Sequence, residues 1–230
     1  LYLKGFGDPD LNSGDIQTLA SEITKRGIKE ITGNIVADDS YFDNKYYTLS
    51  GVYKGDTGPS YWPYVSGLCL DKSAGATTAG NLLSSDLSSM GVNVQGTVIA
   101  GVTPSGAKEV AQVSHALYDV LAYMLKESDN HSAITMFKLL GAKYKSTPAT
   151  LEDAQEVIIS YLSELGIDRY SYEILEGSGL TRYNKVNGEL YIKLLKSMYD
   201  DRFTFDYFMN SLSIAGKDGT LRKRMIGTEA

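Results

Sequence analysis

The stretch Met124-Leu-Lys-Glu-Ser-Asp-Asn130 joins two helical patterns near the middle of the 230-residue chain. Apolar residues at helical spacing form one face before it and a second face after it. The first face comprises Leu117, Val120, Leu121, Met124 and Leu125, and the second Ile134, Phe137 and Leu140. We expect Gly141 to end the second helix. The tripeptide Ser128-Asp129-Asn130 is therefore predicted to form a short polar turn between two helices.

A Ser-x-Asn tripeptide in such a turn is one of three elements used by penicillin-recognising serine acyl-transferases, beside Ser-x-x-Lys and Lys-Thr-Gly. The Ser128 hydroxyl could pass a proton between a lysine and a leaving amine, and the Asn130 amide could donate to a substrate carbonyl. The competing interpretation is a polar turn in which Ser128 or Asp129 caps the next helix. The tripeptide alone does not decide between them.

Two segments imitate the other elements, and we reject both. Ser105-Gly-Ala-Lys108 has the Ser-x-x-Lys spacing, but Pro104-Ser105-Gly106 is typical of a turn, whereas the nucleophile needs the start of a helix. Lys217-Asp-Gly219 carries Asp218 in place of a hydroxyl residue, and its negative charge would repel a substrate carboxylate. We predict ordinary turns at both places.

A second motif is Glu176-Gly-Ser-Gly-Leu-Thr-Arg-Tyr-Asn184, which follows an expected strand at 172–175. Its two glycines permit close approach of a ligand, and Arg182 could pair with a carboxylate. A tight strand-to-helix loop is an equal competitor. His131, beside the first motif, is expected to be a surface residue, and Asp129 a spacer without chemistry.

Composition excludes several classes of function. The chain has 22 basic and 28 acidic residues and a net charge of −6, so we expect no nucleic-acid partner. Its lone cysteine, Cys69, excludes an internal disulfide, and two histidines are too few for a His-rich metal site. We expect no metal and no cofactor. No apolar run approaches the roughly 20 residues of a membrane span, so any membrane association is expected to be peripheral.

The first half of the chain alternates helix and strand patterns. Ser13 is a candidate cap for a helix, and Gly27 and Gly91 each end a helix before a strand. The strand segments Gly33-Asn-Ile-Val-Ala37 and Gly96-Thr-Val-Ile-Ala100 are alike, which either duplication or convergence on a common pattern explains.

Long helices follow the turn at Gly106, including one that begins with a capping box at Thr150-Leu-Glu-Asp153. We therefore predict a β-rich, mixed region over 1–108 and a mostly helical region over 109–230. The chain opens inside a strand-like run at Leu1 and stops at Gly227-Thr-Glu-Ala230 without a terminating element, so we expect a segment of a longer protein.

Six segments together resemble the D-alanyl-D-alanine carboxypeptidase/endopeptidase family, the class C low-molecular-mass penicillin-binding proteins. They occur in family order along almost the whole chain. They are Leu1-Tyr-Leu-Lys-Gly-Phe-Gly-Asp-Pro-Asp-Leu11, Ile31-Thr-Gly-Asn-Ile-Val-Ala-Asp-Asp-Ser-Tyr-Phe42, Val65-Ser-Gly-Leu68, Met124–Asn130, Glu176–Asn184 and Ile214-Ala-Gly-Lys-Asp-Gly-Thr-Leu221.

The resemblance implies an α/β (α+β) fold: part of a penicillin-binding, serine β-lactamase-like transpeptidase domain with β-rich inserted domains over 1–108. By family role, Ser128 and Asn130 match the catalytic loop. The substrate-cleft loop is matched by Ser178, Gly179, Leu180 and Arg182, with Thr181 in place of the more usual serine. The nucleophile's Ser-x-x-Lys and the Lys-Thr-Gly strand are expected outside this chain.

The first hypothesis that follows is a penicillin-sensitive serine-type D-Ala-D-Ala peptidase acting through an acyl-enzyme, with peptidoglycan peptides and β-lactams as partners. Such a substrate implies an extracytoplasmic location, in the periplasm or cell envelope. The segment alone is expected to be inactive. The alternative is a non-catalytic envelope protein of the same fold that binds peptidoglycan.

Overall fold

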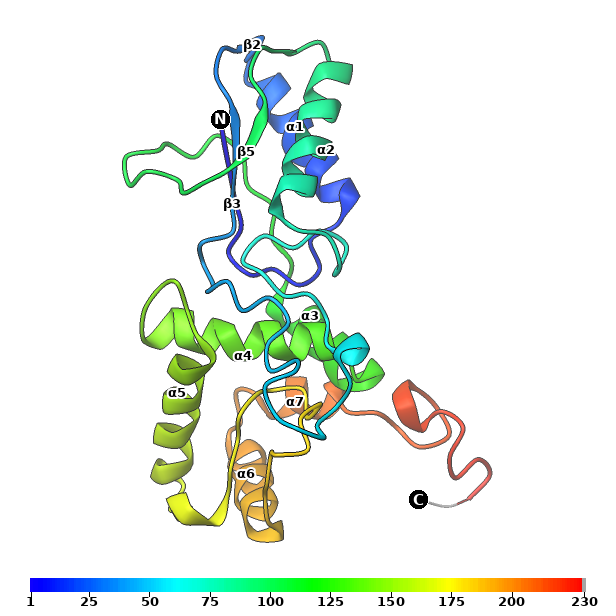
Figure 1. Cartoon of the computed structure of the whole chain (residues 1–230). Coiled ribbons are helices and arrows are strands. Elements are labelled where there is room, and N and C mark those ends of the chain that lie inside the picture. Colours follow the sequence, from blue (N-terminus) through cyan, green and yellow to red (C-terminus); the bar gives the residue numbers. More distant parts are fainter. Residues whose placement is uncertain (229–230) are drawn as a thin grey trace.

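The computed structural model describes residues 1–228 (Figure 1). It divides into a sheet unit, which holds the strands between Tyr2 and Ala100, and a helical part, which holds the helices between Leu117 and Ser211. Glu229 and Ala230, the last two residues of the C-terminal segment Gly227–Ala230, lie outside the described residues. The N-terminus lies in the sheet unit and the C-terminal segment extends from the helical part (Figure 1). The two regions expected from the sequence, 1–108 and 109–230, remain a prediction about domains.

The sheet unit is built on three parallel strands, β1 (Tyr2–Lys4), β3 (Ile35–Asp38) and β5 (Val98–Ala100), in the order β1-β3-β5. Two helices, α1 (Ser13–Lys25) and α2 (Ala76–Ser89), cover the sheet side by side (Figure 1). Parallel strands need crossover connections, and the helices provide them. A second parallel pair, β2 (Glu30–Ile31) and β4 (Asn93–Val94), extends the unit.

The two similar strand segments of the sequence lie side by side in register. Ile35 pairs with Val98 and Ala37 with Ala100, so equivalent residues of the two segments are neighbours across the sheet. A Cβ atom on Gly96 would lie 2.4 Å from the carbonyl oxygen of Gly33, a separation that only glycine permits. Close approach of the two backbones therefore explains why a glycine opens the second segment.

Most helix ends follow the predicted signals. A capping box at Thr150 begins α5 (Leu151–Glu164), as predicted, while the box of α1 uses Asn12, one residue before the expected Ser13. At Gly91 and Gly166 the following amide bonds back to a carbonyl five residues earlier, which is the Schellman ending.

The helical part contains five α-helices over residues 117–211, and residues 1–228 also form three short 3₁₀ turns. The helices are α3 (Leu117–Glu127), α4 (Asn130–Tyr144), α5, α6 (Gly188–Asp200) and α7 (Phe205–Ser211), and the 3₁₀ turns are η1 (Pro59–Tyr61), η2 (Arg169–Ser171) and η3 (Gly219–Leu221). The strand expected over 172–175 is reduced to a single antiparallel bridge between Glu173 and Lys185. None of the helices formed by residues 1–228 is both long and apolar enough to cross a bilayer.

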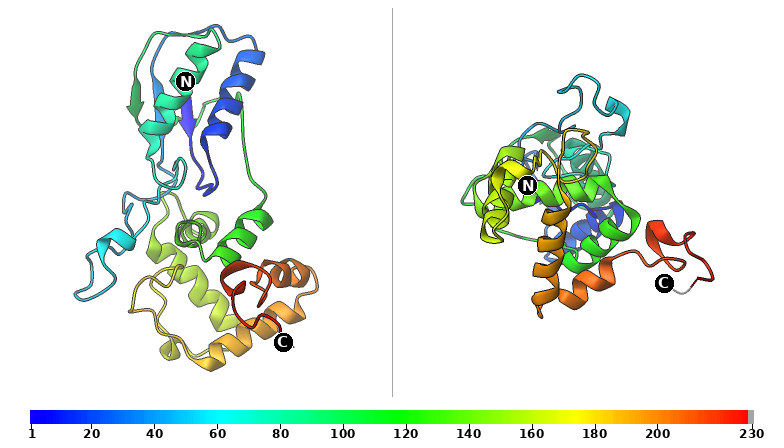
Figure 2. Two further views of the ribbon diagram at one scale, coloured as in Figure 1. Left: turned by 90° about the vertical axis from the view of Figure 1, so that its right-hand side faces the viewer. Right: turned by 90° about the horizontal axis from the view of Figure 1, so that it is seen from below.

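Residues 41–66, although early in the chain, pack against the helical part. Phe42, Trp62 and Val65 form a buried cluster with Ile134 of α4 and with Ala149. Figure 1 shows this segment, in cyan, leaving the sheet unit toward the helices, and Figure 2 shows that part of it projects to one side of them. The irregular segment therefore joins the two parts of the molecule through side-chain packing.

The predicted helix end at Gly141 is wrong, because α4 continues to Tyr144. A Cβ atom at Gly141 would lie 2.9 Å from the Cβ of Asp153 and 3.2 Å from the amide nitrogen of Ala154. This glycine is thus selected by the close crossing of α4 and α5 and does not end the helix.

Gly141→Ala is expected to lower the free energy of unfolding by about 1–3 kcal/mol, because overpacking against the α5 backbone outweighs the better helix propensity of alanine. Gly188→Ala is the matched control, since a Cβ there meets open space at the start of α6. Urea unfolding of both variants measures the difference. Equal stability of the Gly141→Ala variant and wild type would contradict the close packing of α4 against α5 at Gly141.

Candidate functional site

The Ser128–Asn130 turn lies between α3 and α4, as predicted. Ser128 adopts left-handed backbone angles, with φ 58° and ψ 50°, and its amide donates to the carbonyl of Met124. Asn130 is the first residue of α4. The left-handed residue ends α3, α4 begins two residues later, and Ser128 is exposed at the surface of the turn.

Asp129, expected to be a spacer, is the best-bonded residue of the turn. Its carboxylate accepts from the Lys72 ammonium and, at 2.6 Å, from the Ser132 hydroxyl. Burial raises the pKa of Asp129, but the bonds from Lys72 and Ser132 outweigh it, and the pKa lies below its usual value. The contact between Asp129 and Ser132, three residues apart at the start of a helix, could have been predicted from the sequence. Lys72 is 57 residues away and could not have been found.

The Lys72–Ser132 pair does not form a Ser–Lys nucleophile. Burial lowers the pKa of Lys72, but its bond and charge interaction with Asp129 outweigh it, and the pKa is raised. Lys72 is therefore protonated near neutral pH and cannot act as a base. The Ser132 hydroxyl is fully buried and donates to Asp129.

The expectation that His131 is a surface residue is wrong. Its side chain is buried in the first turn of α4, and neither ring nitrogen has a hydrogen-bond partner among residues 1–228. Burial lowers the pKa of His131 to about 4, so the ring is neutral at physiological pH. The helix turns this face toward the protein interior, which a single polar residue in the sequence could not indicate.

The second motif forms a loop organised around a buried carboxylate. Glu176 accepts hydrogen bonds from the amide of Ser178, at 2.6 Å, and from the Ser178 hydroxyl. The amide of Thr181 and the side chain of Asn184 add bonds of 3.3 and 3.2 Å. The glycines and polar residues of the motif therefore wrap the chain around one acidic group.

The segment at residues 53–57 holds the other side of this loop. Asp56 accepts from the Thr181 hydroxyl at 2.7 Å and from the Arg182 amide at 2.8 Å. Tyr53 stacks on Tyr183 with ring centroids 4.5 Å apart. These contacts fix the backbone of the loop, while the Arg182 side chain is exposed.

The turn and the loop border the same helix. A Cβ atom on Gly177 would lie 2.8 Å from the carbonyl oxygen of Ala133, in the first turn of α4. Asn130 begins that turn, so the predicted catalytic residues and the loop that carries Ser178, Gly179, Leu180 and Arg182 share the N-terminal end of α4.

A third segment packs against the end of α3. The Lys126 ammonium donates to the carbonyl of Leu212 at 3.0 Å and to Asp218 at 2.6 Å. Asp218 also accepts from the amide of Ile214, so Lys217-Asp-Gly219 is a structural turn, as predicted. Ser105 likewise lies in an exposed turn.

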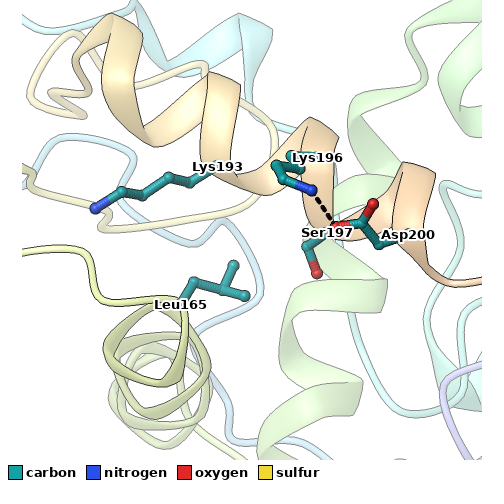
Figure 3. Close-up of a pocket in the computed structure, with 5 residues that line it drawn as sticks. All are labelled: Leu165, Lys193, Lys196, Ser197 and Asp200. Carbon is teal, nitrogen blue, oxygen red and sulfur yellow. Dashed lines mark hydrogen bonds and ion pairs between the residues drawn. The ribbon is translucent and has the colours of Figure 1, made fainter.

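A shallow pocket of about 330 Å³ lies elsewhere, between the end of α5 and α6. Figure 3 shows that its two lysines diverge, with Lys196 directed toward Asp200 and Lys193 pointing away. None of the predicted site residues lines it.

Comparison with known proteins shows the family. The family model of D-Ala-D-Ala carboxypeptidase 3 (S13) matches residues 1–79 and 66–230, so the chain belongs to this family, as the sequence resemblance indicated. D-alanyl-D-alanine carboxypeptidase DacB of Haemophilus influenzae is 24% identical over 97% of this chain and 62% of its own length. D-alanyl-D-alanine carboxypeptidase of Actinomadura sp. (strain R39) is 25% identical over 100% of this chain and 59% of its own.

The fold is that of a solved relative. The crystal structure of penicillin binding protein 4 (dacB) from Haemophilus influenzae superimposes with a TM-score of 0.80 at 22% identity, covering 97% of this chain and 66% of that one. The predicted fold class is therefore confirmed. The chain spans about 60% of the length of the curated relatives it matches.

The relatives are also longer within the matched region. The alignment with the Haemophilus protein runs over 302 positions, more than the 230 residues of this chain. The two matched ranges of the family model overlap at residues 66–79. Insertions carried by the relatives are accordingly shorter or absent here.

We expect acid to destabilise the protein through His131. A buried histidine with a lowered pKa contributes full stability above its ordinary value of 6.5 and loses it as the pH falls toward 4. The free energy of unfolding should drop by about 1–2 kcal/mol between pH 7 and pH 5 on this account. Urea unfolding of wild type and His131→Gln at both pH values measures it, and the variant should lose less.

His115→Gln is the matched control with the opposite sign. The hydrogen bond to Asp8 raises the pKa of His115, so its stabilising effect is present at low pH and is lost as the pH rises. Its removal should make the loss between pH 7 and pH 5 steeper. Identical pH dependence in wild type and His131→Gln would contradict the assignment of a neutral, buried imidazole.

Proposed function

We propose that this chain is part of a serine-type D-Ala-D-Ala carboxypeptidase/endopeptidase that cleaves peptidoglycan peptides through an acyl-enzyme. The observation that carries the proposal is the arrangement at α4: in a chain of the S13 family, the Ser128–Asn130 turn and the 176–184 loop border the same helix end. Peptidoglycan peptides as substrates place the protein outside the cytoplasm, in the periplasm or cell envelope. β-Lactams would react at the same site.

The predicted site residues divide the work of catalysis and binding in this proposal. The serine that attacks the D-Ala–D-Ala carbonyl is supplied by sequence outside residues 1–230. The exposed Ser128 hydroxyl passes a proton to the leaving amine, and the Asn130 amide donates to the substrate. The loop residues Ser178, Gly179 and Leu180 line the cleft.

Arg182 completes the substrate-binding loop. Its backbone is fixed by Asp56 while its side chain is exposed, which suits a guanidinium that meets a carboxylate of the peptide. Glu176 and Asp56 already hold the loop in one conformation. Substrate binding therefore does not carry the entropic cost of ordering its backbone.

Ser128→Ala in the full-length protein should lower the rate of D-Ala release by about 10²–10⁴-fold, since a positioned proton-transfer group contributes about that factor. Release of D-alanine from a D-Ala-D-Ala peptide measures the rate. Ser105→Ala is the matched control, because Ser105 lies in an exposed turn and should leave the rate unchanged. Unchanged turnover in Ser128→Ala would refute the proton-transfer role.

The isolated 230-residue chain should not be labelled by a fluorescent penicillin, whereas the full-length protein should be. The reason is that Ser105-Gly-Ala-Lys108 is a turn, where no lysine one helical turn later can activate the hydroxyl. Gel fluorescence after denaturation detects the covalent adduct. Labelling of the isolated chain, abolished by Ser105→Ala, would overturn this assignment.

A further inference from the structure

We propose that Lys72 is a positioning residue for the Ser128–Asn130 turn, holding it through Asp129 in the geometry that proton transfer needs. This inference rests on the proposed function, since it assigns Lys72 to the same site. Lys72 lies in the first part of the chain, far from the motif in sequence, and no role was predicted for it.

The backbone at Lys72 is fixed by the sheet unit. Asp71 and Lys72 are consecutive residues with left-handed angles, φ 50° and 57°. The Asp71 amide donates to the carbonyl of Leu11 at 2.9 Å, and the Ser13 hydroxyl donates to the Asp71 carboxylate at 2.8 Å. The loop is therefore anchored beside the start of α1, and Lys72 extends from a fixed point.

The Lys72 ammonium then bridges several elements of the molecule. It binds Asp129 in the turn, lies 3.2 Å from the Ser132 hydroxyl of α4, and is 3.4 Å from Asp10. It also lies 4.3 Å from the centroid of the Tyr123 ring on α3. With side chains 28% and 19% exposed, Lys72 and Asp129 form a partly buried pair that solvent screens less than a surface pair.

The position of Asp129 explains why this pair matters for Ser128 and Asn130. Asp129 lies between them in the chain, so anchoring its carboxylate to Lys72 and Ser132 limits how far the peptide groups on either side can shift. Left-handed backbone angles at Ser128 are sparsely populated for a non-glycine residue and persist where the surroundings impose them. A displacement of about 1 Å at a reacting group can lower a rate by about 100-fold.

The surroundings of Asp129 make Lys72 its cationic partner. His131, the next residue, is buried and neutral near pH 7, and Asp10 carries the same charge as Asp129. Removal of the ammonium would leave a partly buried carboxylate facing Ser132, neutral His131 and negative Asp10. The turn would then relax toward solvent.

The first experiment compares full-length wild type with Lys72→Met and Lys72→Arg. Acylation by a fluorescent penicillin is expected to be about 10- to 100-fold slower in Lys72→Met, and the arginine variant, which keeps the charge, should recover most of the rate. Lys25→Met is the matched control, since Lys25 forms an exposed pair with Glu22 on α1 and should acylate as wild type does. If Lys72→Met does not fold, Lys72→Gln replaces it with the same expected result.

The second experiment tests whether Lys72 acts through Asp129. Acylation by Lys72→Met/Asp129→Asn should be no slower than by Asp129→Asn alone, because the lysine then has no carboxylate to hold. In Lys72→Met the acid limb of the pH profile should move to higher pH, since the pKa of Asp129 rises without the ammonium. Asp129→Asn should abolish that movement, which a general loss of stability would not do.

The outcomes separate this inference from the proposed function. Full activity of Lys72→Met beside an inactive Asn130→Ala would overturn the role of Lys72 alone. Rate losses that multiply in the double variant, or a pH profile that Lys72→Met does not move, would overturn it as well. Full activity of both Asn130→Ala and Ser128→Ala would instead refute the proposed function itself.

Discussion

A buried ion pair between Lys138 and Asp43 joins the irregular part of the chain to the helices. Lys138 is fully buried on α4, and its ammonium lies 2.6 Å from the Asp43 carboxylate and 3.3 Å from the carbonyl of Lys45. Burial lowers the pKa of Lys138, and Asp43 opposes this by stabilising the charge. Loss of either partner would leave an uncompensated buried charge, which costs about 3–5 kcal/mol.

The site depends on that pair through a sequence of contacts. The segment that begins at Asp43 continues to Asp56, which holds the 176–184 loop by Thr181 and Arg182. The loop in turn packs on α4 at Gly177. Lys138 therefore fixes one end of a segment whose other end orders the loop at 176–184. The same helix, α4, begins at Asn130 of the predicted catalytic turn.

The sequence predicted those features that depend on interactions between residues close together in the chain. The helices themselves, the capping box at Thr150 and the polar turn at Ser128–Asn130 follow from periodicity and short-range hydrogen bonds within a few residues. The apolar face expected for α3 is buried only at Val120, while Leu117 and Leu125 are 61% and 39% exposed. The similar strand segments were visible as well, although their pairing in register was not. The family order of six segments then supplied the fold, which periodicity alone could not have given.

Tertiary contacts account for what the sequence did not reveal. Gly141 reads as a helix end, yet the crossing with α5 requires it inside α4. His131 reads as a surface residue because nothing nearby in sequence shows which way that face of α4 turns. Lys72 and Asp56 reach their partners across 57 and more than 100 residues, and one sequence offers no means of pairing them.

The backbone of Ser128 also limits which side chains can serve there. Threonine carries the same hydroxyl and could transfer the same proton, but its branched Cβ crowds the backbone when φ is positive. Alanine and asparagine fit these angles better and lack a hydroxyl in the right place. Serine therefore meets both requirements of the turn, because it tolerates the left-handed backbone and supplies a hydroxyl. Threonine would keep the hydroxyl but disturb the backbone of the turn.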